Sequence, residues 1–365
     1  PAVHATAVHI TPNSDGRNIL YYDTLDSTHE LEAKDGFATD FGADWRTATI
    51  LSNSGNDYYG LMYSDADSAY SEGRYYASGD QSMWYSTDGQ YWLPQTSVPE
   101  GYYGKMAHNG SGTWVMVKPQ YSNVAQWSTD HGTTWNTTNS GSTGLTQYQS
   151  WEGLAYGNGV FVATASTKSS SFQTVRYSTN GSNWTNASNL GDSYALNQVA
   201  WSEEQQLFMI VSGKSASSWY GNSSVWTSAD GDTWTAQPAL ADSDQYGLID
   251  VVYAEDKWVA VGYSGVILHS SNNGQFWETA NFLQGNPDFA DVDFSDVVHA
   301  NGYFVAKSRG LKGASSSDGI NWKPFTASAS MNTEEMFSAN GKIFTANSAL
   351  RFSKGKVCWI EPEAA

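Results

Sequence analysis

Acidic side chains are the most numerous candidates for chemistry in this chain, and many of them gather in two consecutive segments. Carboxylate oxygens at this density are the ligands that Ca²⁺ prefers. The spacing does not match an EF-hand loop, and a solvated acidic loop is the commoner outcome, so Ca²⁺ binding is kept as the alternative. The first segment holds Asp242, Asp244 and Asp250, and the second, which carries the candidate Ca²⁺ site, holds Asp288, Asp291, Asp293 and Asp296.

Aromatic side chains recur in the segments that precede successive apolar strands. Tyr and Trp offer flat apolar faces to sugar C–H groups and a polar edge to hydroxyls. Several such rings on one face indicate multivalent weak binding. The alternative is that any single ring only caps the core beneath it. The predicted ligand-binding residues are Tyr59, Tyr103, Tyr148, Trp151, Tyr194 and Tyr246.

Constellations typical of catalysis are not found in the sequence. The seven histidines have no metal-ligand spacing, and the single cysteine, Cys358, cannot form an internal disulfide or a zinc site built on Cys pairs. His9, His108 and His299 share one repeat position with aromatic residues, which favours packing between repeats over chemistry. We therefore predict that the chain is not an enzyme.

Net charge and composition exclude several classes of partner. The chain carries 18 Lys and Arg against 37 Asp and Glu, a net charge of −19. A protein that follows a nucleic-acid backbone needs the opposite sign, and an anionic membrane surface would repel this one. No apolar run approaches the roughly 18 residues that a membrane span needs. The segment from Pro1 resembles no secretory signal, so localisation stays unknown, with a virion or the extracellular space favoured over the cytoplasm.

One short pattern, called the box here, recurs seven times as Ser/Thr-x-Asp/Asn-(x)-Gly-x-x-Trp. Asp and Asn bond their own backbone two residues on, and Gly takes a positive φ without strain, so each box predicts a tight turn. The Trp that follows enters the next strand as a packing anchor. In every copy Trp follows Gly by three residues, and these anchors are Trp45, Trp92, Trp135, Trp184, Trp234, Trp277 and Trp322.

The elements that carry the boxes repeat about every 46 residues along the chain. Each repeat shows two apolar strands, a strand into the box and a strand led by Trp. Four antiparallel strands at this period indicate a β-propeller blade. Residues 7–31 fit the start of the scheme, and a last unit ends near Trp359. We therefore predict an all-β chain and a single propeller domain over residues 1–365 with eight modules; seven blades is the alternative, if the two terminal units share one blade.

This pattern resembles the Asp-box, or BNR, repeat of sialidase-like β-propellers. The copies around Asp40 and Asp130 keep the family's one residue between Asp and Gly, and the other five drop it, which marks a divergent branch. The resemblance implies that the boxes lie on the periphery and are not catalytic. It also implies that a sialidase would need an arginine cluster to bind the carboxylate of its substrate. The six arginines here fall at unlike positions within their repeats, so we do not expect them to converge on one pocket.

Three functions follow from these observations. The leading one is a non-catalytic recognition propeller that binds cell-surface glycan or a protein receptor, as a phage or virion component. The second is a structural or assembly protein of a larger complex such as a virion tail or capsid. The third is a glycoside hydrolase, for which no carboxylate pair stands out among the 37 acids.

Overall fold

The chain forms β-strands throughout the part that the computed structural model describes. That part comprises residues 11–12, 18–19, 45–47, 49–50, 58–65, 69–79, 82–95, 104–117, 125–138, 145, 150–166, 174–190, 194–215, 223–238, 240, 247–282, 292–308, 310–327, 335–346 and 351–353. Within these ranges every regular element is a strand. The predicted all-β class is therefore confirmed, while a single domain over residues 1–365 stays a prediction.

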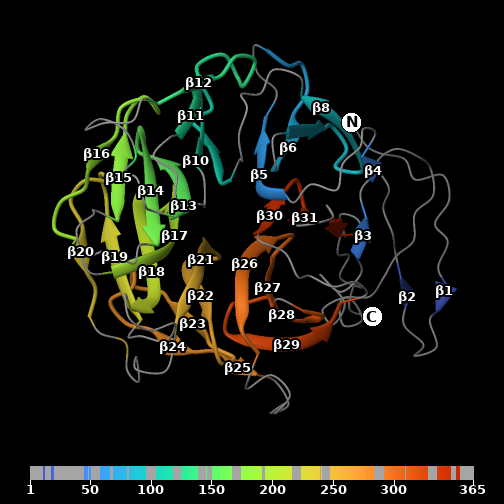
Figure 1. Ribbon diagram of the computed structural model, residues 1–365. Coiled ribbons are helices and arrows are strands. Elements are labelled where there is room, and N and C mark those ends of the chain that lie inside the picture. The colour runs from blue at the N-terminus through green and yellow to red at the C-terminus, as the bar shows by residue number, and fades with distance from the viewer. Residues whose placement is uncertain are drawn as a thin grey trace.

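Seven sheets stand as blades around one axis, each built mainly from antiparallel neighbours in chain order (Figure 1). Blade I holds β5 (Tyr58–Ser64), β6 (Arg74–Gly79), β7 (Ser82–Ser86) and β8 (Tyr91–Gln95). Blade II holds β9 (Met106–His108), β10 (Trp114–Val117), β11 (Ala125–Ser128) and β12 (Asn136–Thr137). Blade III holds β13 (Ser150–Gly157), β14 (Val160–Ser166), β15 (Val175–Ser178) and β16 (Thr185–Asn186).

The remaining blades follow the same order from the axis outward. Blade IV holds β17 (Tyr194–Ser202), β18 (Leu207–Ser215), β19 (Ser224–Ser228) and β20 (Thr235–Ala236). Blade V holds β21 (Leu248–Ala254), β22 (Lys257–Gly262), β23 (Ile267–Ser270) and β24 (Glu278–Thr279). Blade VI holds β26 (Phe294–Ala300), β27 (Tyr303–Ser308), β28 (Lys312–Ser316) and β29 (Asn321–Thr326), and β25 (Asn281–Phe282) joins its outer edge in parallel.

Blade VII closes the ring by joining the two ends of the chain. Its inner strands β30 (Glu335–Ala339), β31 (Lys342–Ala346) and β32 (Arg351–Ser353) come from the C-terminal region, and its outer strand β3 (Trp45–Thr47) comes from the first box. The two terminal units therefore share one blade, so the eight modules give seven blades, as the alternative prediction had it. The chain then passes to β4 (Thr49–Ile50), which pairs with β8 on the edge of blade I.

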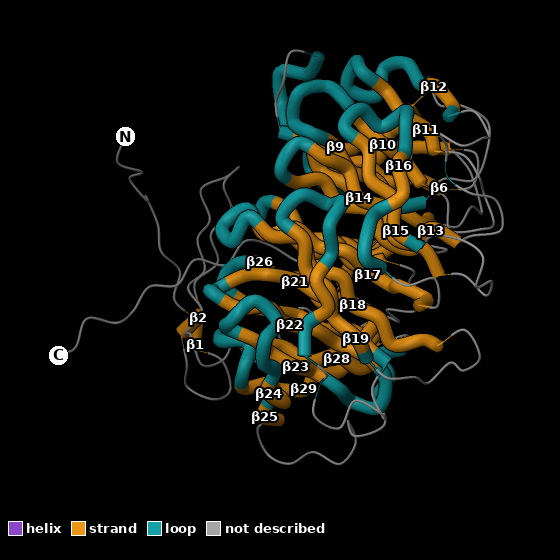
Figure 2. The backbone as a smooth tube through the Cα atoms, turned by 90° about the vertical axis from the view of Figure 1, so that its left-hand side faces the viewer, coloured by secondary structure: helices purple, strands orange, loops and turns teal. Residues whose placement is uncertain are grey.

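The N-terminal segment does not supply a blade of its own. The strands β1 (Thr11–Pro12) and β2 (Asn18–Ile19) pair only with each other, and two views of the molecule place them outside the ring (Figures 1 and 2). The N-terminal unit thus contributes its box strand, β3, to the ring, whereas β1 and β2 lie apart from it.

The box turns have the local geometry that their residue types predict. In blade IV, Asp230 accepts hydrogen bonds from the backbone N–H groups of Asp232 and Thr233 at 2.9 and 2.8 Å, and Gly231 has a φ of +74°. The indole of Trp234 donates to the carbonyl of Gly231 at 3.0 Å. A Cβ atom at Gly231 would lie 2.7 Å from Val162 of the neighbouring blade, so glycine is required there for both φ and space.

The box of blade V starts one residue earlier than its sequence suggests. Ser270, rather than Ser271, accepts the N–H of Gly274 at 3.0 Å, and the side chain of Asn272 accepts the N–H of Phe276 at 2.9 Å. Asn273 is the extra residue, with a φ of +58°. This copy therefore keeps one residue between Asn and Gly, so the expectation that it drops that residue is wrong.

The hydrophobic core consists of separate clusters, each lying between two neighbouring blades. Between blades III and IV, for example, Val162 packs with Phe208 and Trp234. The same holds across the closure, where Phe344 of blade VII lies among Tyr75 and Trp92 of blade I. Each blade thus buries both of its faces only when both neighbours are in place.

The described residues contain no helix with the length and apolar character that crossing a bilayer requires.

The box carboxylate of blade IV provides a test of this local geometry. We expect Asp230→Ala to lower the free energy of unfolding by about 1–2 kcal/mol, because two backbone N–H groups lose their acceptor. Asp230→Asn is the matched control, since Asn180 accepts the equivalent N–H groups of Ser182 and Asn183 at 3.0 and 2.9 Å in blade III. Urea unfolding of the three proteins measures both effects; equal losses for Ala and Asn would contradict the role of the side-chain oxygen.

Candidate functional site in the central channel

The innermost strands of the seven blades converge on a central channel. In five of them the pairing with the second strand shifts register near the start of the strand, as at Leu248/Asp250 and Phe294/Asp296. Such bulges re-aim the side chain beside them. The residues that share this repeat position are Gly60, Lys105, Gly153, Gln198, Asp250, Asp296 and Glu335.

Three consecutive blades use a carboxylate at this position to hold the next blade. Asp250 of blade V accepts the backbone N–H of Val297 in blade VI at 2.8 Å. Asp296 of blade VI accepts the N–H of Met336 in blade VII at 3.0 Å. Glu335 of blade VII accepts the N–H of Leu61 in blade I at 2.9 Å, which carries the series across the ring closure.

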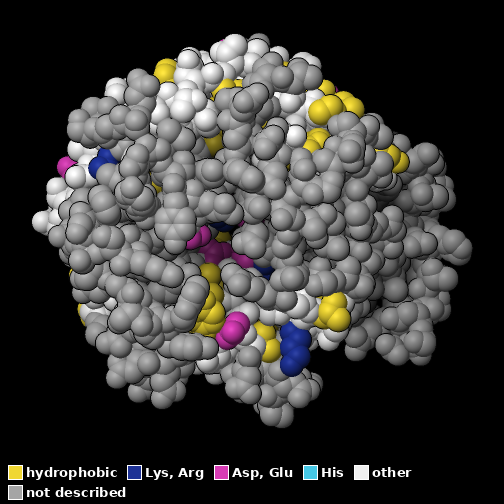
Figure 3. Space-filling model, in the orientation of Figure 1, with side chains coloured by type: hydrophobic (Ala, Val, Ile, Leu, Met, Phe, Trp, Pro, Cys, Tyr) yellow, Lys and Arg dark blue, Asp and Glu magenta, His cyan; other side chains and the backbone are white. Residues whose placement is uncertain are grey.

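Two lysines accompany these acids, and the five residues together are called the charge belt here. Lys105 lies 3.0 Å from Glu335, between side-chain nitrogen and carboxylate oxygen. Lys307 reaches inward from the second strand of blade VI, lies 2.6 Å from Asp296 and also donates to the hydroxyl of Ser295 at 3.0 Å. The Lys307 side chain is 0% exposed. Acidic and basic side chains are visible at the bottom of a central hollow (Figure 3).

The belt holds one more carboxylate than it holds lysines, and Asp250 has no salt bridge among the described residues. Burial, and next the negative charge of Asp296, raise the pKa of Asp250 to about 7, against the opposing effects of the Val297 N–H and the Lys105 charge. Burial also raises the pKa of Glu335, although Lys105 opposes the change. Burial lowers the pKa of Lys105, but Glu335, Asp296 and Asp250 outweigh it and hold that pKa above its usual range.

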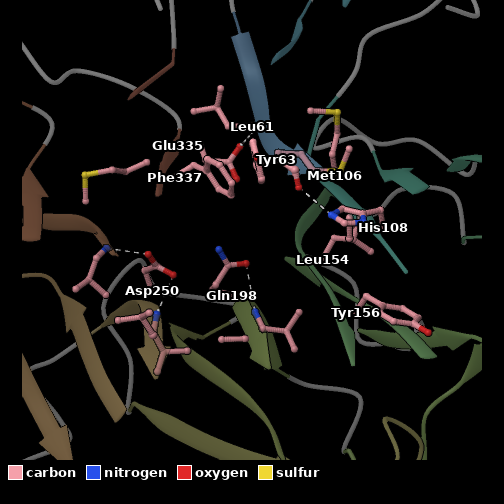
Figure 4. Close-up of a pocket in the computed structure, with 18 residues that line it drawn as sticks. Leu61, Tyr63, Met106, His108, Leu154, Tyr156, Gln198, Asp250, Glu335 and Phe337 are labelled. Carbon is pink, nitrogen blue, oxygen red and sulfur yellow. Dashed lines mark hydrogen bonds between the residues drawn. The ribbon is translucent and has the colours of Figure 1, made fainter. Parts of the chain in front are cut away.

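A cavity of about 350 Å³ occupies the channel beside the belt. Asp250, Glu335 and the amide of Gln198 lie on one side of it, and Met106 and Leu154 lie toward the other (Figure 4). The cavity therefore combines a polar wall that contains buried carboxylates with a wall on which Met106 and Leu154 lie beside His108.

The column of histidines and aromatic residues belongs to the packing between strands and blades, as predicted for His108 and His299; His9 lies outside the described residues. The ring of Tyr156 lies 4.7 Å from that of Phe161, and the ring of His299 lies 4.8 Å from that of Phe304. His108 donates from Nε2 to the backbone carbonyl of Tyr63 in the preceding blade at 2.8 Å. These contacts bind neighbouring strands and blades to each other.

Most of the predicted aromatic ligand-binding residues lie wholly or partly outside the described part of the chain. Tyr103, Tyr148 and Tyr246 lie outside the described residues, and for Tyr59 and Tyr194 only the backbone is described, at the inner strands β5 and β17. Trp151 is different: it lies on β13 with 0% of its surface exposed, inside the cluster between blades II and III. The expectation that Trp151 presents a face to ligand is therefore wrong, because its indole forms part of the core.

The structure places the acidic residues predicted to lie in loops in different settings. Asp288 and Asp291 lie outside the described residues, and Asp293 is exposed and accepts the N–H of Ser264 at 3.0 Å. Asp296 is not a loop residue, because it lies on β26 with one carboxylate oxygen on Met336 and the other on Lys307. Among the described residues no group of three or more His, Cys, Asp or Glu side chains is arranged to hold a metal ion.

Sequence reasoning missed Lys105, Lys307 and Glu335 as members of a site. A signal was present in part: Lys105 and Glu335 occupy the position directly before the apolar pair of their repeats, as Asp250 and Asp296 do. Lys307 lies on a second strand, and no repeat position marks it.

Comparison with known proteins supports the fold alone. No protein-family model matches the chain, and no curated protein matches it. Among solved structures it is similar to YCF48 bound to D1 peptide, with 14% identity, a TM-score of 0.60 and coverage of 84% of this chain and 96% of that one. YCF48 from Cyanidioschyzon merolae has 14% identity, a TM-score of 0.59 and coverage of 84% and 97%. The WD40 β-propeller domain of Doa1 has 12% identity, a TM-score of 0.56 and coverage of 86% and 98%.

The buried ion pair of blade VI leads to a prediction about stability. We expect Lys307→Met to lower the free energy of unfolding by about 3–5 kcal/mol, because Asp296 then remains buried without its cation. Adding Asp296→Asn should recover much of this loss, since the charge is gone while an amide oxygen still accepts the Met336 N–H. A double-mutant cycle by urea unfolding measures both steps; independent, additive losses would contradict the pairing.

The raised pKa of Asp250 leads to a prediction about pH. Because its pKa is higher in the folded chain than in the unfolded one, the stabilisation from the bound proton is complete below the unfolded value and is lost as pH rises through about 7. We expect wild type to lose about 1 kcal/mol more than Asp250→Asn between about pH 6 and about pH 8. Urea unfolding of both proteins at the two pH values measures this difference, and the histidine contributions cancel in it. Parallel pH profiles would contradict the prediction.

Proposed function

We propose that this chain is a non-catalytic recognition propeller that binds a cell-surface glycan or a protein receptor. The proposed binding face is the one on which the inner strands begin, because Tyr103 and Tyr246 directly precede the residues that lead into β9 and β21 in the sequence. The setting proposed with it is a phage or virion component, and the relationship proposed is a divergent branch of the sialidase-like Asp-box propellers. The box geometry, with Asp or Asn, positive-φ Gly and an anchored Trp in blades I to VI, supports that relationship.

The observation that carries the non-catalytic part is the structural use of the channel carboxylates. Glycoside hydrolysis needs one carboxylic acid and one carboxylate, both free to act on the sugar. Asp250, Asp296 and Glu335 each accept a backbone N–H of the next blade, and two of them also hold a lysine. Any proton transfer by them would disturb contacts between blades, which supports a binding role for the channel.

A known propeller gives limited further support. The similar structure of YCF48 is described as bound to D1 peptide, so a propeller of this fold holds a peptide in that case. At 14% identity this likeness extends to the fold, and a peptide or protein ligand for the present chain remains part of the proposal.

An assembly role in a larger complex, such as a virion tail or capsid, is the second candidate. It is favoured by large apolar side chains on the outer rim. Tyr91 and Leu93 on β8 are 51% and 41% exposed, and Phe276 in the box of blade V is 61% exposed. Exposed apolar residues at a rim suit docking against another subunit.

A glycan array, run with and without EDTA, tests the proposal. We expect saturable binding that falls in Tyr103→Ala and Tyr246→Ala, because aromatic faces supply the sugar contacts, and that persists in Tyr91→Ala, which alters the outer rim instead. Loss of binding in EDTA would support a cation site at the remaining predicted acids, Asp288, Asp291 and Asp293, because Asp296 is already held by the Met336 N–H and by Lys307.

Two other results would redirect the proposal. Turnover of a chromogenic glycoside panel would overturn the non-catalytic reading. A blank array with folded protein would exclude a glycan as the ligand. Purification at fixed stoichiometry with a large assembly would then favour the assembly role.

A further inference from the structure

The charge belt leaves one buried carboxylate without a cation. Lys105 pairs with Glu335 and Lys307 pairs with Asp296, whereas Asp250 has two backbone N–H groups as its hydrogen-bond donors, from Val251 and Val297, each at 2.8 Å. Only 8% of Asp250 is exposed. A buried charge in this condition either takes up a proton or attracts a cation.

The cavity beside Asp250 has the right composition for a cation on an apolar stem. Among the described residues, Asp250 and Glu335 are the carboxylates that line it, and Gln198 adds an uncharged amide beside Asp250 (Figure 4). The opposite wall presents the apolar side chains of Met106 and Leu154, with His108 beside them (Figure 4). Methionine in particular adapts to flexible aliphatic chains. The volume of about 350 Å³ admits one long side chain.

We propose that this cavity binds a single lysine or arginine side chain of a partner protein, with its cationic group beside Asp250 and its aliphatic stem against Met106 and Leu154. The inference rests on the proposed function, because it assumes a protein partner on the face where the inner strands begin. It identifies the chemistry of one anchor of that partner. Long cationic side chains bury their stems along apolar surfaces in this manner.

The incoming cation competes with the proton of Asp250. The charged groups around Asp250 are Asp296 and Lys307 from blade VI, Glu335 from blade VII and Lys105 at the start of β9; blade IV presents the uncharged Asn197 and Gln198. Because the pKa of Asp250 is about 7, this carboxyl group carries a proton at mildly acidic pH. At mildly alkaline pH the carboxylate is free to bind the cation. Binding must therefore release protons near neutral pH.

Calorimetric titration with Nα-acetyl-lysine methylamide tests the proposal, and the norleucine analogue, which lacks only the amine, is the control ligand. We expect the lysine compound to bind about tenfold more tightly at about pH 8 than at about pH 6, and to release about half a proton at about pH 7. The proton count comes from repeating the titration in buffers of different ionisation enthalpy. The norleucine compound should not bind.

A charge-matched pair of variants locates the site. Asp250→Asn should abolish binding of the lysine compound, whereas Glu278→Gln, which removes an exposed carboxylate on the outer strand β24 of the same blade, should leave it unchanged. If Asp250→Asn does not fold, the proton release of the wild-type chain still decides the question.

Several outcomes would overturn the inference. These are no binding of the lysine compound, equal binding of the norleucine compound, binding without proton release, or equal loss in both variants. Binding of butylamine but not of Nα-acetyl-lysine methylamide would limit the site to small alkylamines and overturn the proposal of a partner side chain. Glycan or receptor binding that survives Asp250→Asn would leave the proposed function in place while removing this anchor, so the two failures are distinguishable.

Discussion

Each blade of this propeller has two apolar faces and buries them only between two neighbours, so the ring must close. Closure depends on β3 pairing with β32, which brings the first box of the chain into the last blade. Phe344 then packs against Tyr75 and Trp92, and the apolar contacts continue from blade VII to blade I. An open series of blades would leave an apolar face in water at each end, at a large cost in free energy.

Ring closure also determines which side chains line the central channel. The first strand of each blade has no neighbour on its inner side, so its backbone N–H groups near the start of the strand need other acceptors. In blades V, VI and VII a carboxylate provides the acceptor for the next blade, and two lysines offset part of the charge that this brings into the interior. The same contacts that hold the ring together leave the unpaired charge of Asp250 facing a partly apolar cavity.

The sequence predicted the parts of this fold that rest on local contacts. The box turns and the positive φ of their glycines follow from hydrogen bonds between residues two to four positions apart, and the four strands per repeat follow from the apolar pattern between the turns. Predictions that depended on where a side chain lies in the closed ring were wrong in two cases. Trp151 was expected on the surface and lies in the core, and Asp296 was expected in a loop and lies on an inner strand.

By itself, then, the sequence determined the repeat, the blade and the all-β class, because turn formation and strand alternation act over a few residues. Only the tertiary structure decided the number of blades and the members of the channel site. Those depend on contacts such as that between Leu61 and Glu335, which are 274 residues apart. No local pattern specifies such a pair, since the two residues meet only after every intervening blade has packed and the ring has closed.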